Sequence, residues 1–231
     1  IGAFTLGSNV TIDTNATDTT GDITLGAITG GSNNLSLSTG NNIANSDIAF
    51  DGAISGLGNL TLTDVGGTAS FNNNVALAAF SANNTVASIT FTGSTNTFSG
   101  TATFANDTNL IFGNSTDDSF TFNGGLTTSS VGGTVTLNTN ISSSDDALTF
   151  GAITLGNNVT IDTNSTTTNR ADITIGAVTG GSNTLTLTTE NNVTGSDITA
   201  SGAISGVTTL TLASVGGTAT LSGDVDVTTL A

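Results

Sequence analysis

Five aspartates occur at intervals that would bring their carboxylates together if the chain repeated as stacked turns. They are Asp22, Asp47, Asp146, Asp172 and Asp197. The pairs Asp22/Asp47 and Asp172/Asp197 share one interval, the length of a single short repeat. Carboxylate oxygens suit Ca²⁺, and like charges on neighbouring turns repel unless a cation or water lies between them. The spacing gives five candidate calcium ligands, and calcium is the only cofactor it suggests. The alternative is that each acid is hydrated where a strand begins.

Catalytic side chains are scarce in this chain. It has no His and no Lys, and Arg170 is its only cationic side chain. Acid–base chemistry on a polysaccharide needs paired carboxylates in a cleft, or a base beside a cation. The neighbouring acids Asp117/Asp118 and Asp145/Asp146 offer two pairs, but adjacent residues of a strand point to opposite faces. We therefore expect no catalytic residues and no enzymatic activity.

The charge balance narrows the range of partners. The formal net charge is −16 although only 8% of residues are charged. Nucleic-acid binding depends on cations that neutralise phosphates, so we expect no nucleic-acid partner. No run of about 18 apolar residues is present, so we expect no membrane-spanning helix and no membrane insertion. Cysteine is absent, which excludes disulfides and thiolate metal sites.

A repeat of about 25 residues must position all of these side chains. The slot Asn9-Val10-Thr11-Ile12 returns at Asn34-Leu35-Ser36-Leu37 and at Asn59-Leu60-Thr61-Leu62. It recurs further along at residues 109–112, 134–137, 158–161, 184–187 and 209–212, and it fits poorly near Asn84. A fixed period in this range indicates identical stacked units. We call each unit a rung, and the 231 residues hold about nine of them.

Each rung has the sequence features of strands joined by corners. Apolar residues alternate with Thr or Ser, which places them on one face of a strand. Gly-Ala-Ile corners recur, as at residues 26–28 and 52–54, and Gly supplies the backbone angles that corners need. One rung cannot bury its apolar face alone, whereas rungs stacked about 4.8 Å apart can. The sequence therefore predicts an all-β fold, a right-handed parallel β-solenoid over residues 1–231 as one continuous segment.

Two sets of residues are expected to line this stack. The first is an asparagine column whose amides would hydrogen-bond from rung to rung: Asn9, Asn34, Asn59, Asn84, Asn109 and Asn158. The second is the group of eight phenylalanines, out of eleven, that lie between Phe71 and Phe122. Their rings would fill the interior as a stack.

A longer repeat of about 150 residues, equal to six short periods, is superimposed on the first. Gly2 to Phe71 matches Gly151 to Leu221, with one insertion near Arg170. Duplication of a block lengthens a rod but does not readily build an active site. We expect any specific role to lie where the pattern departs, around Asn84 and at the Arg170 insertion.

The Gly-Ala-Ile corners, the Asn-Leu-Thr-Leu strands and the Val-Gly-Gly-Thr segments at residues 65–68 and 215–218 resemble a group of prokaryotic surface proteins. This group comprises β-strand-repeat proteins: giant adhesins, autotransporter passengers and filamentous-haemagglutinin-like exoproteins. The resemblance covers the whole chain and implies a secreted or cell-surface location. It favours a non-enzymatic rod segment of an adhesin or extracellular fibre. The first residue is Ile and no signal peptide is visible, so we interpret the chain as part of a longer protein.

Three alternative functions remain open from the sequence. The chain could be a self-assembling filament or sheath subunit, in which the partner is a second copy rather than further rungs of a parent chain. It could be a module that binds a glycan or a host surface through the variable stretches 15–20 and 164–170. Ice binding would need a flat, unbroken Thr grid. The columns of the short repeat interrupt such a grid with Asp13, Ser36, Ser38, Asp162 and Ala213.

Overall fold

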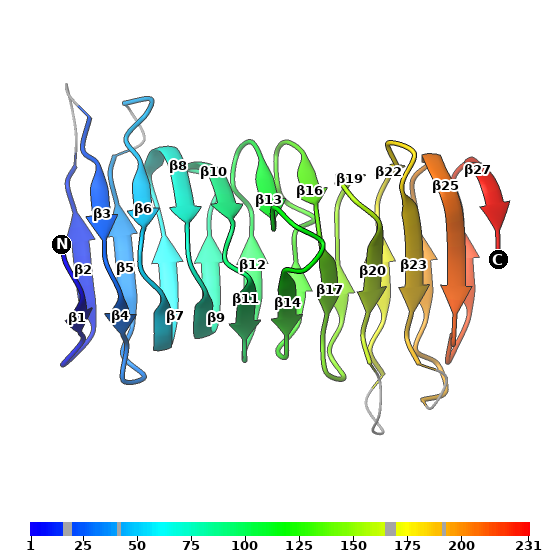
Figure 1. Ribbon diagram of the computed structural model, residues 1–231, viewed down its shortest axis with the longest axis horizontal. Helices are drawn as coiled ribbons and strands as arrows, with labels where there is room; N and C mark the ends of the chain where they lie inside the picture. Colours follow the sequence, from blue (N-terminus) through cyan, green and yellow to red (C-terminus); the bar gives the residue numbers. More distant parts are fainter. Residues whose placement is uncertain (16–19, 41–42, 165–169, 191–192) are drawn as a thin grey trace.

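The fold is an all-β stack of parallel strands. A computed structural model describes residues 1–15, 20–40, 43–164, 170–190 and 193–231. In this part of the chain 27 strands form one sheet, and no helix is present (Figure 1). The strands coil into about nine turns around a common axis, so the predicted parallel β-solenoid is confirmed. At about 4.8 Å per turn the stack is roughly 40 Å long.

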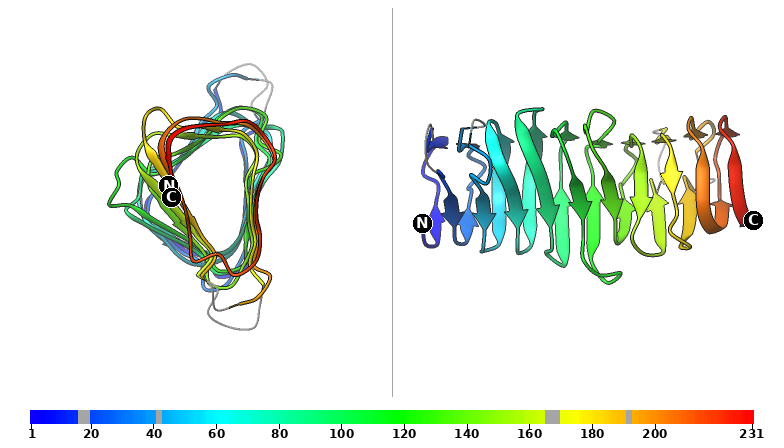
Figure 2. Two further views of the ribbon diagram at one scale, coloured as in Figure 1. Left: turned by 90° about the vertical axis from the view of Figure 1, so that its right-hand side faces the viewer. Right: turned by 90° about the horizontal axis from the view of Figure 1, so that it is seen from above.

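Viewed along its axis, the solenoid is a triangle with three flat faces (Figure 2). The first face contains β1 (Phe4–Thr5), β4 (Ile28–Thr29), β7 (Ile54–Leu62), β9 (Val75–Ala82), β11 (Thr95–Phe98), β14 (Ser119–Phe122), β17 (Asn140–Ser142), β20 (Val159–Asp162), β23 (Thr184–Thr188), β25 (Ile204–Ala213) and β27 (Val225–Leu230). The second face contains β2 (Val10–Asp13), β5 (Leu35–Ser38), β12 (Ala102–Phe104), β15 (Leu126–Thr127), β18 (Leu148–Thr149), β21 (Ile173–Ile175), β24 (Ile198–Ala200) and β26 (Ala219–Leu221). The third face contains β3 (Ile23–Leu25), β6 (Ile48–Phe50), β8 (Val65–Phe71), β10 (Val86–Phe91), β13 (Leu110–Phe112), β16 (Val135–Leu137), β19 (Ile153–Leu155) and β22 (Val178–Thr179).

Four long strands pass around a corner and belong to two faces. β7 and β9 pair on both the first and the second face. β25 and β27 pair on both the third and the first face. In these strands the chain turns without a loop. One rung can therefore have a protruding turn where the next rung runs straight.

The core is a continuous column of inward-facing side chains. The alternation predicted from the sequence is visible in strands such as β5, where Leu35 and Leu37 are fully buried and Ser36 and Ser38 are half-buried. Every strand of the interior rungs contributes to the same apolar cluster. Because each rung covers the apolar face of its neighbour, the core extends along the axis, and a polar side chain, Asn96, is buried in it between Val75 and Phe120.

Rung length varies along the axis. On the third face, paired residues are 25 positions apart at Ile23 and Ile48 but 20 apart at Ala69 and Ile89. The interval falls to 18 between Val135 and Ile153. The interval of 25 returns between Leu110 and Val135, in the middle, and the last turn is short again, with 21 residues between Ile204 and Val225. Rung length therefore varies because different corners carry different numbers of residues. The fit is poor near Asn84 because the interval has already fallen to 21 between Ile48 and Ala69.

The variable rung length changes the meaning of the long repeat. Starting from Phe4, six successive pairings on the first face lead to Ile141. The counterpart of Phe4 in the second copy is Ile153, which lies two faces further on, in β19. The duplicated block therefore comprises six turns plus two faces rather than six turns. Each segment of the second copy lies one face away from its counterpart: Val10 is on the second face and Val159 on the first.

The phenylalanines form the predicted stack in the interior. Phe50, Phe71 and Phe91 follow one another on the third face with ring centroids 4.3 Å and 4.4 Å apart and interplanar angles of 7° and 11°. Rings from the other faces meet this column edge-on, as Phe98 does against Phe91 at 6.1 Å and 83°. Such stacked and edge-on pairs add to the stability gained by burial alone. The prediction that these rings fill the interior is confirmed.

Candidate functional site

The paired aspartates act as caps between rungs. The Asp22 carboxylate accepts a hydrogen bond from the backbone N–H of Asp47 at 3.0 Å, and that of Asp47 accepts one from Thr68 at 2.7 Å. Asp172 and Asp197 repeat this arrangement in the second copy, with bonds from the N–H groups of Asp197 and Thr218 at 2.8 Å and 2.7 Å. Each carboxylate thus satisfies a donor of the following rung at a corner where the ladder is interrupted.

A glycine allows this cap to form. A Cβ atom on Gly67 would lie 2.0 Å from the Asp47 carboxylate oxygen, and one on Gly217 would lie 2.1 Å from that of Asp197. A side chain at either position would push the carboxylate away from the N–H that it accepts. The Val-Gly-Gly-Thr segments therefore supply both the donor of the cap and the space for its acceptor.

Asp146 lies outside the columns formed by the other four acids. Leu148 pairs with Ile173, which places Ala147 rather than Asp146 beside Asp172. Burial and the neighbouring charge of Asp145 raise the pKa of Asp146 above its ordinary value of 3.8. The five predicted ligands are thus divided into two capping pairs and one separate acid. Within the described residues, no group of three or more acidic side chains is placed to hold a metal ion.

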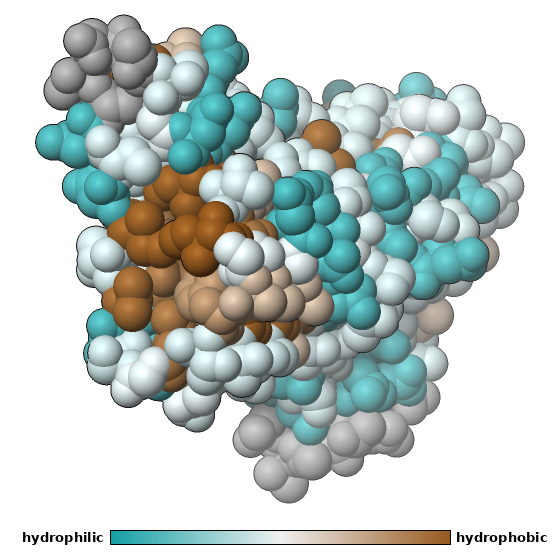
Figure 3. All heavy atoms as spheres, turned by 60° about the vertical axis from the view of Figure 1, so that its left-hand side comes forward, coloured by the Kyte–Doolittle hydropathy of each residue, from teal (hydrophilic) through white to brown (hydrophobic). Residues whose placement is uncertain are grey.

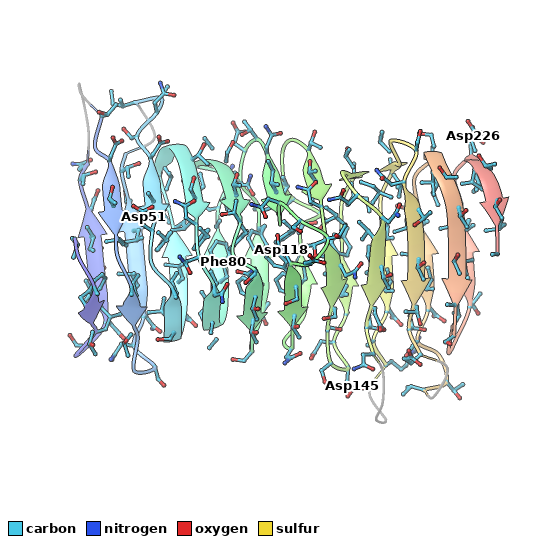
Figure 4. The ribbon with its side chains drawn as sticks, viewed as in Figure 1. Asp51, Phe80, Asp118, Asp145 and Asp226 are labelled. Carbon is cyan, nitrogen blue, oxygen red and sulfur yellow. The ribbon has the colours of Figure 1, made fainter. Side chains whose placement is uncertain are left out.

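The other adjacent acids serve a loop rather than a cleft. Asp118 is buried, and its carboxylate accepts hydrogen bonds from the backbone N–H groups of Asn114 at 2.8 Å and Ser115 at 3.1 Å. Asp117 is exposed. Figure 4 shows Asp118 within the body of the solenoid and Asp145 at a corner away from it. Asp118 is thereby the acceptor that closes its own loop, and it is not paired with Asp117.

The asparagine column is divided among the three faces. Asn9 and Asn34 accept hydrogen bonds from the backbone N–H groups of Asn34 and Asn59 at 2.9 Å and 2.8 Å. These bonds run from backbone to side chain and not between side-chain amides as predicted. In the next rung Asn59 is opposite Ala79, so this ladder ends after three residues.

The remaining three asparagines lie elsewhere because shorter rungs intervene. Asn84 precedes β10 and Asn109 precedes β13, both on the third face. Asn158 precedes β20 on the first face and accepts the N–H of Thr184 at 2.9 Å. The cap of Asn9 and Asn34 therefore recurs at Asn158 on a different face rather than in one column.

Arg170 strengthens one cap of the second copy. Its guanidinium group donates to the Asp197 carboxylate at 3.2 Å and to the carbonyl of Gly195. The first copy has Thr20 at the equivalent position. The side chains of Arg170 and Asp197 are 58% and 37% exposed, so their ion pair is screened by solvent. Arg170 itself is thus part of the capping system of this rung.

One outward column of hydroxyl groups runs unbroken along the second face. It contains Thr11, Ser36, Thr61, Ser81, Thr103, Thr127, Thr149, Thr174, Thr199 and Thr220. The residues expected to interrupt a Thr grid do not break this column. Ser36 is one of its members, and Asp162 and Ala213 lie on the first face. The neighbouring columns are mixed, as the pairing of Asn59 with Ala79 shows. The hydroxyl groups therefore form a single row and not a two-dimensional grid.

A shallow hollow occurs where a protruding turn overhangs a straight strand. The turn at residues 30–33 is held by the Asn33 amide, which donates to the carbonyls of Leu6 at 3.0 Å and Gly30 at 3.1 Å. The next rung rounds the corner at Gly56, whose φ of +59° favours glycine. In the rung after that, β9 passes the same corner without a protruding turn. This leaves a hollow of about 320 Å³ beside the overhanging turn. Its lining is neutral and combines small apolar residues with hydroxyl groups: Ser32, Gly56, Leu57, Gly58, Ala76, Leu77, Ala78, Thr97 and Ser99.

The second copy has a hollow at the corresponding corner, but it is smaller and its lining includes the carboxylate of Asp226. Asn183 holds its turn through bonds to the carbonyls of Leu155 and Gly180, both at 3.0 Å, and Gly206 rounds the corner with φ +67°. The hollow measures about 190 Å³ and is lined by Ser182, Gly206, Val207, Thr208, Asp226, Val227 and Thr228. Because of the shift by one face, the two hollows open on different sides of the triangle. Sequence reasoning missed them because they depend on the lengths of neighbouring rungs.

The stretches expected to recognise a partner are mostly outside the described residues. This applies to residues 16–19 and 165–169. Near Asn84, where the sequence departs from the short repeat, the structure has a hollow of about 230 Å³. It is lined by Val65, Gly66, Asn84, Thr85, Ala87 and Asp107. Of the described residues, none belongs to a helix long and apolar enough to cross a membrane.

No protein-family model, no curated protein and no solved structure matches this chain.

Proposed function

We propose that these 231 residues are a non-enzymatic structural rod, a segment of a secreted or cell-surface prokaryotic adhesin or extracellular fibre. The observation that carries this proposal is the continuity of the parallel ladders on all three faces from the first turn to the last. A rod of this kind resists bending and stretching because the backbone hydrogen bonds between rungs and the apolar core extend along its whole length.

The distribution of polar groups supports the same proposal. Four of the candidate side chains, those of Asp22, Asp47, Asn9 and Asn34, accept backbone N–H groups at corners. The outward residues are mainly Thr and Ser, which favour strands and carry no charge. A surface of mainly hydroxyl groups, with several corners closed by their own side chains, suits a spacer that holds another part of a protein away from a cell.

Two measurements test this proposal. Antibodies raised against the chain should label intact cells of the source organism, because a surface rod is accessible without permeabilisation. Labelling that appears only after permeabilisation would rule out the proposed location. In single-molecule stretching, the isolated segment should extend in successive steps as rungs detach from one end. Collapse in one step at low force would contradict a load-bearing role.

A second candidate function, glycan binding, is favoured by the recurrence of the hollow in both copies. The first hollow lacks charged side chains, and it offers hydroxyl groups from Ser32, Thr97 and Ser99 beside the apolar surface of Leu57 and Leu77. Neutral sugars present the same combination of hydroxyl groups and apolar ring faces.

A glycan array tests the second candidate. Ala76→Phe fills the first hollow, whereas Ala49→Phe places the same ring outward on the third face and serves as the matched control. Binding that is reduced by the first substitution and not by the second would support the hollow as the site. The absence of binding by the unmodified chain would exclude this function for the glycans tested.

A further inference from the structure

One corner in the middle of the solenoid carries a dipeptide that can react with itself. Asn123 is followed by Gly124, and no other asparagine of the sequence is followed by glycine. Asn123 is exposed, and its side-chain amide forms no hydrogen bond within the described part of the chain. Figure 3 shows hydrophilic residues and residues of intermediate hydropathy over most of the solenoid's side, behind its apolar N-terminal end. Water therefore reaches an exposed corner such as this one.

The backbone nitrogen of Gly124 is available as a nucleophile. The N–H groups on either side of it are occupied: that of Asn123 donates to the carbonyl of Phe98 at 2.8 Å, and that of Gly125 donates to the carbonyl of Phe122 at 3.2 Å. Between them, the N–H of Gly124 donates to no group of the described residues. Its proton can therefore be taken by a base from solution.

The stacking of the rungs requires glycine at this position. A Cβ atom on Gly124 would lie 2.2 Å from the carbonyl carbon of Gly100 and 2.4 Å from its Cα, in the preceding rung. The turn then continues through Gly125 with a φ of +85°, which favours glycine. Because Gly124 has no Cβ, nothing on that residue hinders the approach of its nitrogen to the Asn123 side chain. The geometry of the corner thus maintains the reactive pair.

A second exposed loop shows the opposite arrangement. Asn114 is exposed and is followed by another small residue, Ser115. The N–H of Ser115, however, donates to the Asp118 carboxylate at 3.1 Å. A negative charge beside an N–H group disfavours loss of its proton. The two loops therefore differ in the state of the nitrogen after the asparagine and not in the exposure of the asparagine itself.

We propose that Asn123 is a site of spontaneous deamidation. The Gly124 nitrogen, deprotonated by hydroxide, forms a bond to Cγ of Asn123, and the bond from Cγ to Nδ2 breaks. The amide nitrogen leaves as ammonia, and a five-membered succinimide remains. Water then opens the ring at either carbonyl and gives aspartate or isoaspartate. One water is consumed and one ammonia is released, with no oxidation or reduction. The reaction does not depend on the rod function proposed above.

The new carboxylate would appear at a corner that is already acidic. Leu126 pairs with Leu148 directly after the turn, so the turn lies against residues 143–147 of the next rung. These residues include Asp145 and Asp146. A further negative charge beside them is repulsive, and isoaspartate also inserts one atom into a backbone that is paired with the neighbouring rungs. Aged protein should therefore melt at a lower temperature than fresh protein.

Mass spectrometry of the purified chain during incubation in mildly alkaline buffer tests this inference. The mass should increase as an amide NH₂ is replaced by OH, and fragmentation should place the change at Asn123 before any other asparagine. The rate should rise about tenfold for each pH unit, because the deprotonated fraction of a very weak acid grows in that proportion. An isoaspartate methyltransferase should label the product. Asn123→Gln should abolish the reaction, since a glutamine side chain closes a larger ring more slowly.

Ser115→Gly separates the effect of the fold from that of the dipeptide. This variant has a second Asn-Gly pair, whose nitrogen still faces the Asp118 carboxylate. In the folded protein Asn114 should react at least about tenfold more slowly than Asn123, because that carboxylate disfavours the deprotonated nitrogen. In denaturant the two asparagines should react at similar rates, and a melting curve checks that the variant folds.

Three results would overturn the proposal. They are the absence of a mass change in the folded chain, a first reaction at an asparagine other than Asn123, and equal rates at Asn114 and Asn123 in folded Ser115→Gly.

Discussion

The two repeat copies and the stretch between them have the same triangular cross-section, but different kinds of side chain stabilise it. The copies have long rungs with protruding turns, and aspartate, asparagine and glycine residues hold their corners. The middle has rungs of uneven length, 25 residues between Leu110 and Val135 but 18 between Val135 and Ile153, and an interior packed with phenylalanine rings. The shape is therefore set by the backbone ladders, while its local stability comes from corner caps in the copies and from ring packing in the middle.

The largest expected effect is the loss of a central ring. Phe91 contacts six other rings, four of them edge-on, and is fully buried. Phe91→Ala should lower the free energy of unfolding by about 3 to 5 kcal/mol. Leu185→Ala, at a fully buried position of the second copy, should cost about 1 kcal/mol less because no ring pairs are lost. Chemical denaturation of both variants checks this, and equal losses would remove the distinction between middle and copies.

A smaller loss of folding stability is expected when a side chain is added at a corner of the first copy. A Cβ on Gly52 would lie 2.1 Å from the backbone nitrogen of Ala27, whereas one on Gly2 would meet nothing within 4 Å. Gly52→Ala should therefore destabilise the chain by about 1 to 3 kcal/mol. Gly2→Ala, in the same Gly-Ala context, is the control and should change little. Similar melting temperatures for the two variants would show that the corners of the copies tolerate crowding.

The aspartate caps of the two copies should differ slightly in how much they contribute to folding stability. Asp47→Ala leaves the N–H of Thr68 without its acceptor and should cost about 1 kcal/mol. Asp197→Ala also removes the ion pair with Arg170 and should cost slightly more at low salt, by less than about 1 kcal/mol. High salt or Arg170→Thr should eliminate this difference. A thermal double-mutant cycle measures it, and a difference that persists in the Arg170→Thr background would mean that Arg170 is not its source.

The smallest effect is a pH dependence at the junction before the second copy. Burial and Asp145 raise the pKa of Asp146 above 3.8, so the folded state binds the proton more tightly than the unfolded state. Ionised Asp146 therefore lowers stability at neutral pH, and this loss disappears as the pH falls through the raised pKa. Asp146→Asn should raise the melting temperature at neutral pH and not below pH 3.8. Asp117→Asn, at an exposed position, is the control. An equal gain at both pH values would contradict this assignment.

The sequence predicted the fold because the alternation of apolar residues survives in every rung. Strands such as Leu35–Ser38 could be identified individually, and stacking followed from the inability of one rung to bury its own core. The columns could not be predicted in the same way. Rung length depends on how many residues each corner requires, and β9 passes its corner with no turn at all.

The unpredictable rung length explains which candidate site residues were placed in the correct column and which were not. Pairs within one copy, such as Asp22 and Asp47, were aligned correctly because their rungs keep the length of the short repeat. Asn84, Asn109 and Asp146 were misaligned because shorter rungs intervene. The row of hydroxyl groups on the second face went unrecognised for the same reason, since its members are unevenly spaced in the sequence.

The shift of the duplicated block by one face has a geometric consequence for any longer rod made of such blocks. Each new block would turn its hollows and corner caps by one third of a revolution relative to the block before it. Three blocks complete a whole number of turns and return these features to their original azimuth. A rod lengthened in this way would present the same surface in three directions, so its contacts with its surroundings would not depend on its rotation about its own axis.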